Sequence, residues 1–275
     1  MATAAKKQTI QQAVAQPAKA TVSSPKTSLE KEKFSVYLEN PNVQDSILRV
    51  LNSEDAVRKF SKELLMGVTS ISDLSKCSYP SIVSAALIGA TLNLSSNNAI
   101  GHYYLVPYSG KAQFQLSWKG YYQLAMRSNM YKTIDATAVK EGEIEYFNPI
   151  TKEIKFKPIM DEKVRATKPT IGYYAWFELK NGFRKDEYWS KEKMQQHASR
   201  YSKAFAKKKG DSFWEKDFDS MALKTMYRQL ISKYGPMSTE MEKAYSEDMT
   251  TGEDIEGGNR DYIDNPINAE IVSEE

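Results

Sequence analysis

Three stretches between residues 99 and 190 each predict two short strands that fold back on one another around a tight turn. The first, "AIGHYYLVPYSGKAQFQLSW", turns at "YSGK", and the second places "NPIT" between "EGEIEYF" and "KEIKFKP". The third turns at Asn181 and Gly182, a dipeptide that strongly favours hairpins. Strands joined by such short turns pair antiparallel, so the sequence predicts a small, mostly antiparallel sheet made of β-hairpins.

Helical patterns precede and follow these hairpins. Apolar residues recur at helical spacing from residue 29 to about residue 94, where we expect two or three helices, one of them starting at Ser78. Ser117 is a candidate cap for a helix that ends near Ser128, and a last long helix closes at Gly235. The expected fold class is therefore α+β, with the hairpins backed by helices.

The two ends of the chain differ in composition from its middle. Residues 1–28 hold hardly any large apolar side chain and predict a flexible, disordered N-terminal arm, while residues 236–275 predict an acidic, largely disordered tail. Residues 29–235 then form one core, which is a usual size for a domain. The chain has no run of about twenty apolar residues and no signal-like N-terminus, so we expect no membrane association.

Charge is divided unevenly along the chain. Residues 236–275 carry twelve Asp and Glu against two basic residues, a net charge of −10, whereas residues 1–235 carry 36 Lys and Arg against 23 acids, a net charge of +13. A basic body suggests a polyanion partner, most often nucleic acid, because Lys and Arg neutralise phosphates and release condensed counterions. The alternative is an ordinary solvated basic surface.

Few residues could support catalysis. Cys77 is the single cysteine, so no intrachain disulfide is possible, and only His102 and His197 could easily complete a zinc site. Gly110 and Lys111 lack the upstream glycine and the following hydroxyl of a nucleotide-binding phosphate loop, so ATP use is not expected. The sequence therefore predicts no cofactor and no resident metal.

Glu141, Glu143 and Glu145 keep one enzymatic alternative open, because clustered carboxylates can hold the metal pair of a nuclease. In a register centred on "NPIT", however, Glu143 faces Lys157 and Glu145 faces Lys155. Cross-strand ion pairs are therefore the preferred interpretation of the cluster.

The segment "KAQFQLSWKGYYQLAMRS", residues 111–128, begins with the alternation of a strand and continues with the spacing of a helix. One strand face carries only amides, hydroxyls and ammonium groups, and we expect it to point outward; its members are Lys111, Gln113, Gln115, Ser117 and Lys119. Tyrosines and Arg127 follow at once. Single-strand binders combine a cationic groove with aromatic platforms in this way, although Trp118 could equally belong to the core.

The last long helix offers a second basic face. Lys224 and Arg228 are four residues apart and so lie on one side of the helix, next to an apolar stripe. Such a pair suits adjacent phosphates, with a merely solvated basic face as the alternative. The basic loop "RYSKAFAKKKGDS" allows the same two interpretations, and there diffuse attraction is the more usual role.

Three separated motifs, in this order, resemble the RecT family of phage single-strand annealing proteins, which includes Redβ-like recombinases. They are "NNAIGHYYLVPY", "QFQLSWKGYYQLAMRS" and "FWEKDFDSMALKTMYRQLISKYGPMS", and together they cover roughly residues 75–240. The family's Gly-His-x-Tyr-Leu-x-Pro strand corresponds to residues 101–107 and its Lys/Arg-Gly step to Lys119 and Gly120. Its Lys-Thr and Arg signature corresponds to Lys224, Thr225 and Arg228.

The resemblance implies ATP-independent binding of single-stranded DNA and annealing of complementary strands in homologous recombination, by a protein that is not an enzyme. It implies oligomeric rings or filaments, with a phage exonuclease and a host single-strand-binding protein as candidate partners, in the cytoplasm of a bacterial host that carries the phage or prophage. Residues 29–235 would then be the annealing and oligomerisation core. The acidic tail would either restrain this basic core or recruit a partner.

The residues that we expect to contact DNA fall into two groups. Phosphate and sugar contacts are expected from Lys111, Gln113, Gln115, Lys119, Arg127, Lys224 and Arg228, and stacking from Trp118 and Tyr121. None of these contacts reads base sequence, which suits a protein that leaves base edges free for pairing. A metal-dependent nuclease and a sequence-specific regulator are the competing hypotheses.

Overall fold

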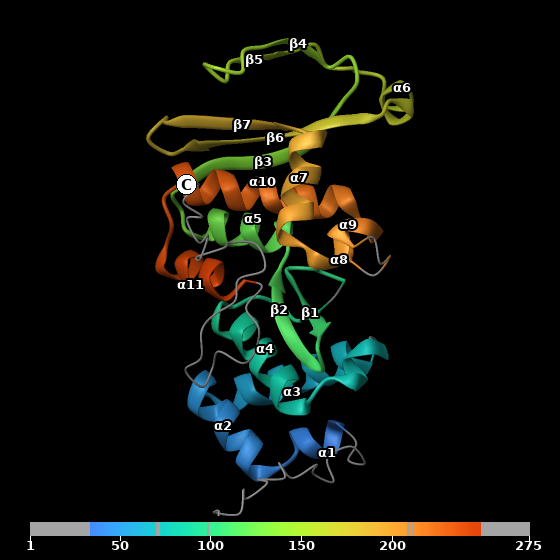
Figure 1. Cartoon of the computed structure of the whole chain (residues 1–275). Coiled ribbons are helices and arrows are strands. Elements are labelled where there is room, and N and C mark those ends of the chain that lie inside the picture. The colour runs from blue at the N-terminus through green and yellow to red at the C-terminus, as the bar shows by residue number, and fades with distance from the viewer. Residues whose placement is uncertain (1–33, 70–71, 98, 208–209, 211, 249–275) are drawn as a thin grey trace, which may run out of the picture. The chain divides into compact units, whose positions relative to one another are not determined.

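The computed structural model describes residues 34–69, 72–97, 99–207, 210 and 212–248 (Figure 1). The predicted N-terminal arm and the part of the acidic tail beyond residue 248 lie outside these residues. Among the described residues, no helix is long and apolar enough to cross a membrane. The mixed α+β class is confirmed, with small antiparallel sheets between helical segments.

The N-terminal part of the core is helical, as the apolar spacing predicted. It contains α1 (Phe34–Leu38), α2 (Pro41–Leu51), α3 (Glu54–Thr69), a short 3₁₀ helix (Ser72–Lys76) and α4 (Tyr79–Thr91). Asn40 caps α2 by accepting a hydrogen bond from the backbone of Asn42, and Ser78 precedes α4 at the predicted position. The side chains of Ile47, Leu74 and Ile82 are fully buried and tie these helices into one core.

The first predicted hairpin forms between β1 (Tyr103–Tyr108) and β2 (Lys111–Leu116). Ser109 and Gly110 have φ angles of 47° and 80°, the left-handed backbone that a two-residue hairpin turn requires. One face of the hairpin packs on α4, where a Cβ on Gly89 would lie 2.3 Å from the ring of Tyr103. A glycine at this position lets the aromatic ring lie directly on the helix backbone.

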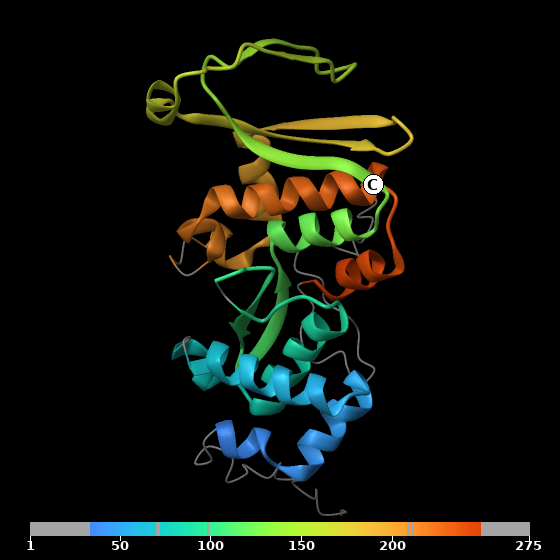
Figure 2. The same cartoon turned by 180° about the vertical axis from the view of Figure 1, so that it is seen from behind.

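A three-stranded antiparallel sheet is ordered β3 (Tyr131–Lys140), β6 (Thr170–Leu179), β7 (Arg184–Ser190). The predicted turn at Asn181 and Gly182 joins β6 to β7, with Gly182 at a φ of 86°. Helix α10 (Phe218–Tyr234) runs under the sheet, with α5 (Trp118–Arg127) beside it, as both views show (Figures 1 and 2). Alternate residues of β6, Tyr173, Ala175 and Phe177, are fully buried.

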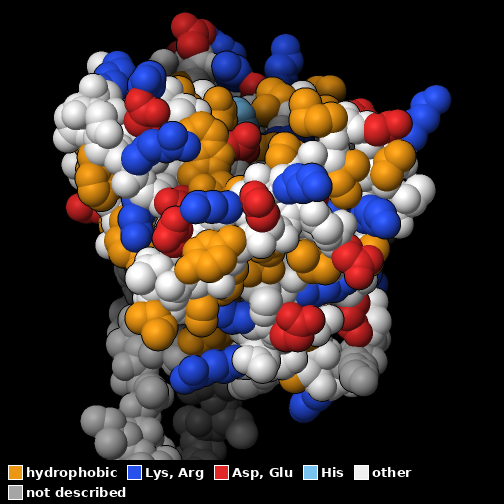
Figure 3. Space-filling model, turned by 90° about the horizontal axis from the view of Figure 1, so that it is seen from above, with side chains coloured by type: hydrophobic (Ala, Val, Ile, Leu, Met, Phe, Trp, Pro, Cys, Tyr) orange, Lys and Arg blue, Asp and Glu red, His pale blue; other side chains and the backbone are white. Residues whose placement is uncertain are grey.

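The middle hairpin, β4 (Ile144–Phe147) with β5 (Ile154–Phe156), lies near the sheet through aromatic contacts of Phe147 with Tyr188 and of Phe156 with Tyr174. A short helix, α6 (Glu162–Thr167), follows it. On the face of the molecule that is at the top of Figure 1, basic, acidic and apolar side chains are interspersed (Figure 3). Such a mixture makes no continuous basic track.

The predicted register of the middle hairpin is partly wrong. Ile144 opposes Phe156 as expected, but a bulge shifts the remainder, so that Tyr146 opposes Lys155. Glu143 does face Lys157, whose backbone N–H donates to the carbonyl oxygen of Glu143 at 2.9 Å, but the carboxylate of Glu143 pairs with Arg165 of α6 at 2.6 Å and not with the Lys157 side chain. A cross-strand pattern could not reveal this partner, because it comes from a later element.

The C-terminal half of the core is largely helical. After β7 come α7 (Lys191–Tyr201), α8 (Lys203–Ala206), α9 (Phe213–Lys216) and α10, which ends at Gly235 as predicted. Ser212 and Glu215 form a capping box on α9, and the side chain of Asp217 caps α10 by accepting from the backbone of Ser220. Two successive caps explain why "FWEKDFDSMALK" forms two helices instead of one.

The prediction of disorder from residue 236 onward is wrong for residues 236–248. Thr239–Glu247 form a helix, α11, capped by Ser238 and with Met241 and Ala244 buried. The high acid content of this stretch concealed a short apolar stripe at helical spacing. The helix packs beside α5 and places Asp248 in the interior.

Candidate nucleic-acid interface

An open cavity of about 350 Å³ lies between the start of α5, the β1–β2 hairpin and the junction of α9 with α10. Three basic side chains line it, Lys119, Lys216 and Lys224, together with three aromatic rings, Tyr104, Trp118 and Phe213. The remaining lining residues are Gly101, Gln115, Leu116, Ser117, Asp217, Ser220 and Met221. The cavity thus brings together residues of all three predicted motifs, the last of which is about one hundred residues from the first two in the sequence.

The α5 wall of the cavity is built by a cap and a glycine. Ser117 caps α5, as predicted, by accepting from the backbone of Gly120 at 3.2 Å, and this places Lys119 in the exposed first turn. A Cβ on Gly120 would lie 2.2 Å from the carbonyl oxygen of His102. The Lys-Gly step therefore combines an exposed cation with the only residue type that permits this close approach.

Trp118, which the sequence left undecided between the core and a base contact, packs against the core and also lines the cavity. Its ring stacks on the buried ring of Tyr227, with centroids 6.2 Å apart and planes inclined by 19°. The residue is only partly buried, lines the cavity, and has the ammonium of Lys119 5.9 Å from its ring centroid. It is a core residue with one side toward the cavity.

The opposite wall comes from α9 and α10, and the sequence analysis missed most of it. Phe213 and Lys216 are exposed on α9, and Asp217 at the helix junction also lines the cavity. The segment "SFWEKD" could have indicated this wall, because the spacing of Ser212 and Glu215 is that of a capping box and predicts the start of a helix that carries an aromatic residue and a cation.

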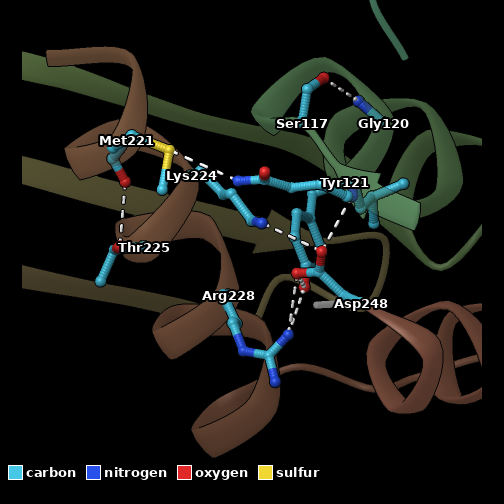
Figure 4. Close-up of polar contacts among 10 residues, drawn as sticks. Ser117, Gly120, Tyr121, Met221, Lys224, Thr225, Arg228 and Asp248 are labelled. Carbon is cyan, nitrogen blue, oxygen red and sulfur yellow. Dashed lines mark hydrogen bonds and ion pairs between the residues drawn. The ribbon is translucent and has the colours of Figure 1, made fainter. Parts of the chain in front are cut away.

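Lys224 and Arg228 are not on a solvated face. They are 3% and 4% exposed, because α10 packs against the sheet and α5, and Tyr245 of α11 lies over Arg228. Lys224 Nζ donates to Asp248 Oδ1 at 3.0 Å and Arg228 Nη1 to Asp248 Oδ2 at 2.9 Å (Figure 4). The carboxylate of Asp248, itself fully buried, supplies the opposite charge that burial of the two cations requires.

Tyr121 belongs to the same network, so the expectation of a surface stacking platform is wrong for this residue. Its ring is 3% exposed; its hydroxyl donates to Asp248 Oδ2 and accepts from Arg228 Nη1, both at 2.9 Å (Figure 4). Burial raises the pKa of Tyr121 well above its ordinary value, against the opposing charge of Arg228. The hydroxyl therefore stays protonated and keeps donating at neutral pH.

Gln113 and Gln115 are also buried, at 5% and 8% exposure, so the expectation that they face outward is wrong. Alternation identifies two faces of a strand but not whether a second element covers the polar one. Gln115 Nε2 lies 3.6 Å from Met221 Sδ of α10, and Gln115 is at the edge of the cavity. Gln113 Nε2 is buried and has no hydrogen-bond partner among the residues that the structure describes.

Arg127 and Lys111 lie away from the cavity lining. The guanidinium of Arg127 donates to the carbonyl oxygens of Leu92 and Asn93 at 2.9 and 3.1 Å, and it forms an ion pair with Glu240 of α11. Lys111 is partly buried at the start of β2, next to the hairpin tip.

Neither His102 nor His197 is among the residues that line the cavity. His102 precedes β1, and burial lowers its pKa, with the positive charges of Arg127 and Lys119 acting in the same direction. Its imidazole is therefore neutral at pH 7. No group of three His, Cys, Asp or Glu that could hold a metal ion occurs within the part of the chain that the structure describes.

Comparison with known proteins gives three findings. A sequence model of the RecT family matches residues 58–261. The chain is 38% identical to the uncharacterized protein YqaK of Bacillus subtilis (strain 168) over 238 residues, which are 86% of this chain and 78% of that protein. It is also 26% identical to Protein RecT of Escherichia coli (strain K12) over 226 residues, 77% of this chain and 78% of that protein.

Proposed function

This chain belongs to the RecT family, and on that basis we propose that it binds single-stranded DNA and anneals complementary strands without a nucleotide cofactor. The protein acts as an oligomer, a ring or a filament, so that successive subunits hold one continuous strand. It serves homologous recombination in the cytoplasm of a bacterial host, with an exonuclease and a single-strand-binding protein as partners. It performs no covalent chemistry on DNA.

The observation that carries the proposal is the cavity between α5 and α9–α10, with cations and aromatic rings on both walls. Lys119 and Lys216 are exposed there and can neutralise phosphates. Phe213, Tyr104 and the outer side of Trp118 offer π-faces on which bases stack irrespective of their identity, at about 1–3 kcal/mol for each base. The combination is the one that sequence-tolerant binding of a single strand needs.

The proposed contacts permit annealing because they leave the pairing edges of the bases free. Ammonium groups hold the backbone, and rings hold the flat faces of bases, so the Watson-Crick edges stay available to a second strand. Pairing itself then tests complementarity. The protein contributes by keeping the first strand extended and by lowering the repulsion between two polyanions.

The test is the rate at which two complementary oligonucleotides pair, with and without the full-length protein, in the absence of nucleotide. We expect acceleration for the complementary pair and none for a noncomplementary pair of the same length. Equal rates with and without protein would overturn the proposal. End-labelled DNA incubated with the protein and Mg²⁺ should stay intact, whereas cleavage would favour a nuclease.

A further inference from the structure

Acidic residues of one C-terminal segment pair with three of the cations that the sequence assigned to DNA phosphates. Glu240 forms an ion pair with Arg127, and Asp248 pairs with both Lys224 and Arg228. Both acids belong to the segment Ser238–Asp248, which consists of α11 and its two flanking residues. One short segment thus supplies the counter-charge for basic side chains of both α5 and α10.

The groups around Asp248 form a complete anion site. Its two carboxylate oxygens accept from the backbone nitrogen of Leu116 at 2.8 Å, from Lys224 Nζ at 3.0 Å, from Tyr121 OH at 2.9 Å and from Arg228 Nη1 at 2.9 Å. A backbone amide, an ammonium, a hydroxyl and a guanidinium are the same donors that proteins use for phosphate oxygens. Nothing in the donor set distinguishes a carboxylate from a phosphodiester.

This anion site adjoins the open cavity. Leu116 and Lys224 each contribute a donor to Asp248 and also line the cavity where we place the DNA strand. A strand in the cavity would therefore lie beside two of the four residues whose donors hold the carboxylate of Asp248. Arg228 is covered by Tyr245 of α11, whose ring centroid is 3.9 Å from the guanidinium carbon, so departure of the segment would uncover this cation too.

The segment Ser238–Asp248 buries few apolar side chains against the rest of the core. Helix α11 has nine residues, too few to be stable alone, and it buries only Met241 and Ala244 among its apolar side chains. Tyr245 packs against the core while only partly buried, and the other anchors are polar, including a hydrogen bond of 3.1 Å from Lys243 Nζ to Thr91 Oγ1. Polar and ionic anchors are those that a competing polyanion can replace.

We propose that the donors around Asp248 form a phosphate-binding site, which the Asp248 carboxylate fills in the absence of DNA and yields to a backbone phosphate when DNA binds. The segment Ser238–Asp248 is then an internal competitor of DNA. This inference rests on the proposed binding of single-stranded DNA. Its alternative is a permanent internal ion pair, in which case DNA would leave the segment in place and Lys224 and Arg228 would have only a structural role.

Hydrogen–deuterium exchange of the wild-type, full-length protein, with and without an oligo(dT) strand, distinguishes the two directly. We expect DNA to increase exchange at the backbone amides of residues 239–248 while protecting the first turn of α5. Unchanged or reduced exchange in 239–248, with protection of α5, would overturn the inference and leave DNA binding intact. If the protein does not bind oligo(dT) at all, the proposed function itself fails.

Two substitutions on α11 provide a matched pair. Glu240→Gln removes the ion pair with Arg127, whereas Glu242→Gln removes the same charge from an exposed position of the same helix that has no ion pair among the described residues. We expect Glu240→Gln to tighten oligo(dT) binding about two- to fivefold, the range of an exposed ion pair, and Glu242→Gln to leave it nearly unchanged. Equal effects would show that only net charge matters and would overturn the inference.

Asp248→Asn tests the centre of the site while nearly preserving the shape of the side chain. We expect oligo(dT) affinity to rise about tenfold or more, because DNA would then be the only anion able to neutralise Lys224 and Arg228. We also expect DNA to raise the melting temperature of this variant more than that of the wild type. Weaker binding by a folded Asp248→Asn protein would contradict the inference. If this variant does not fold, the hydrogen–deuterium exchange experiment and the comparison of Glu240→Gln with Glu242→Gln still test the inference.

Discussion

The ammonium of Lys224 lies 3.0 Å from the carboxylate of Asp248, and the two side chains are 4% and 0% exposed. An exposed lysine can be replaced with an effect on DNA binding alone, whereas replacing a buried, paired lysine also affects the stability of the fold. Removing one partner of a buried pair leaves the other charge without full compensation. Stability and DNA binding are therefore coupled at this position.

Lys224→Met should show both effects. Asp248 would lose one of its four donors, so we expect the free energy of unfolding to fall by about 1–3 kcal/mol in urea titrations. We also expect the slope of log affinity against log salt to decrease by about one unit, because one phosphate contact is lost. An unchanged slope would remove Lys224 from the DNA interface.

Lys119→Ala and Lys216→Ala should weaken DNA binding without affecting stability, because both residues are exposed on the cavity walls. We expect each to reduce the salt slope by about one unit. Lys59→Ala is the matched control, since Lys59 is 79% exposed on α3 and does not line the cavity. Equal losses in all three variants would indicate diffuse attraction and no defined site.

Phe213→Ala should weaken binding of a single strand by about 1–3 kcal/mol, the value of one stacked base. The ring is 45% exposed, so little core packing is lost. Phe183→Ala removes a ring that is 49% exposed on the β6–β7 turn and should leave DNA binding unchanged. Fluorescence anisotropy of labelled oligo(dT) measures both variants, and a Phe213→Ala protein that binds like the wild type would contradict stacking there.

The stability of the protein should decrease as the pH falls from about 6.5 to about 4, in part through His197. Burial lowers the pKa of His197 from 6.5 to about 4, and the charges of Arg228, Lys233, Arg200 and Lys193 act in the same direction. In this window the unfolded chain binds a proton that the folded protein excludes, so acid favours unfolding.

His197→Phe tests this contribution, because the imidazole lies among the rings of Trp189, Tyr201 and Trp214. We expect urea unfolding of the variant to depend less on pH between 4 and 6.5 than unfolding of the wild type. Parallel curves would show that carboxylates alone cause the loss.

Glu143→Gln should destabilise the protein by about 1–3 kcal/mol without affecting annealing. Burial raises the pKa of Glu143, but hydrogen bonds from Arg165 and from the backbone of Lys140 outweigh it and keep the pKa below its usual value. Glu145→Gln, at an exposed position two residues away, is the control and should have little effect. Loss of annealing by a stable Glu143→Gln protein would point instead to a functional carboxylate.

Local patterns were sufficient to predict the hairpin turns, several helix caps and the α+β class. Ser117, Gly182 and Gly235 each lie where the sequence placed them, because a cap or a tight turn depends on a few neighbouring residues. The bulge between β4 and β5 escaped prediction because it breaks the alternation on which the register was based.

The site was harder to predict because its environment depends on distant contacts. Lys224 and Arg228 were correctly placed on one side of a helix, but their burial depends on Asp248, which the acidic composition had assigned to a disordered tail. Gln113 and Gln115 were correctly placed on one strand face, yet α10 covers Gln115. In each case the periodicity of the sequence identified the correct face of the helix or strand, but it could not show which other element covers that face.

Asp248 lies 132 residues after Leu116, and its hydrogen bond to that backbone has a consequence for the synthesis of the chain. On the ribosome, β2, α5 and α10 are all made before the residue that neutralises Lys224 and Arg228. Until residue 248 leaves the exit tunnel, these two cations must stay in water or bind another anion. The core around Lys224 and Arg228 therefore cannot be completed until Asp248 has been synthesised. A fragment that ends before residue 248 would leave these two cations without their carboxylate partner.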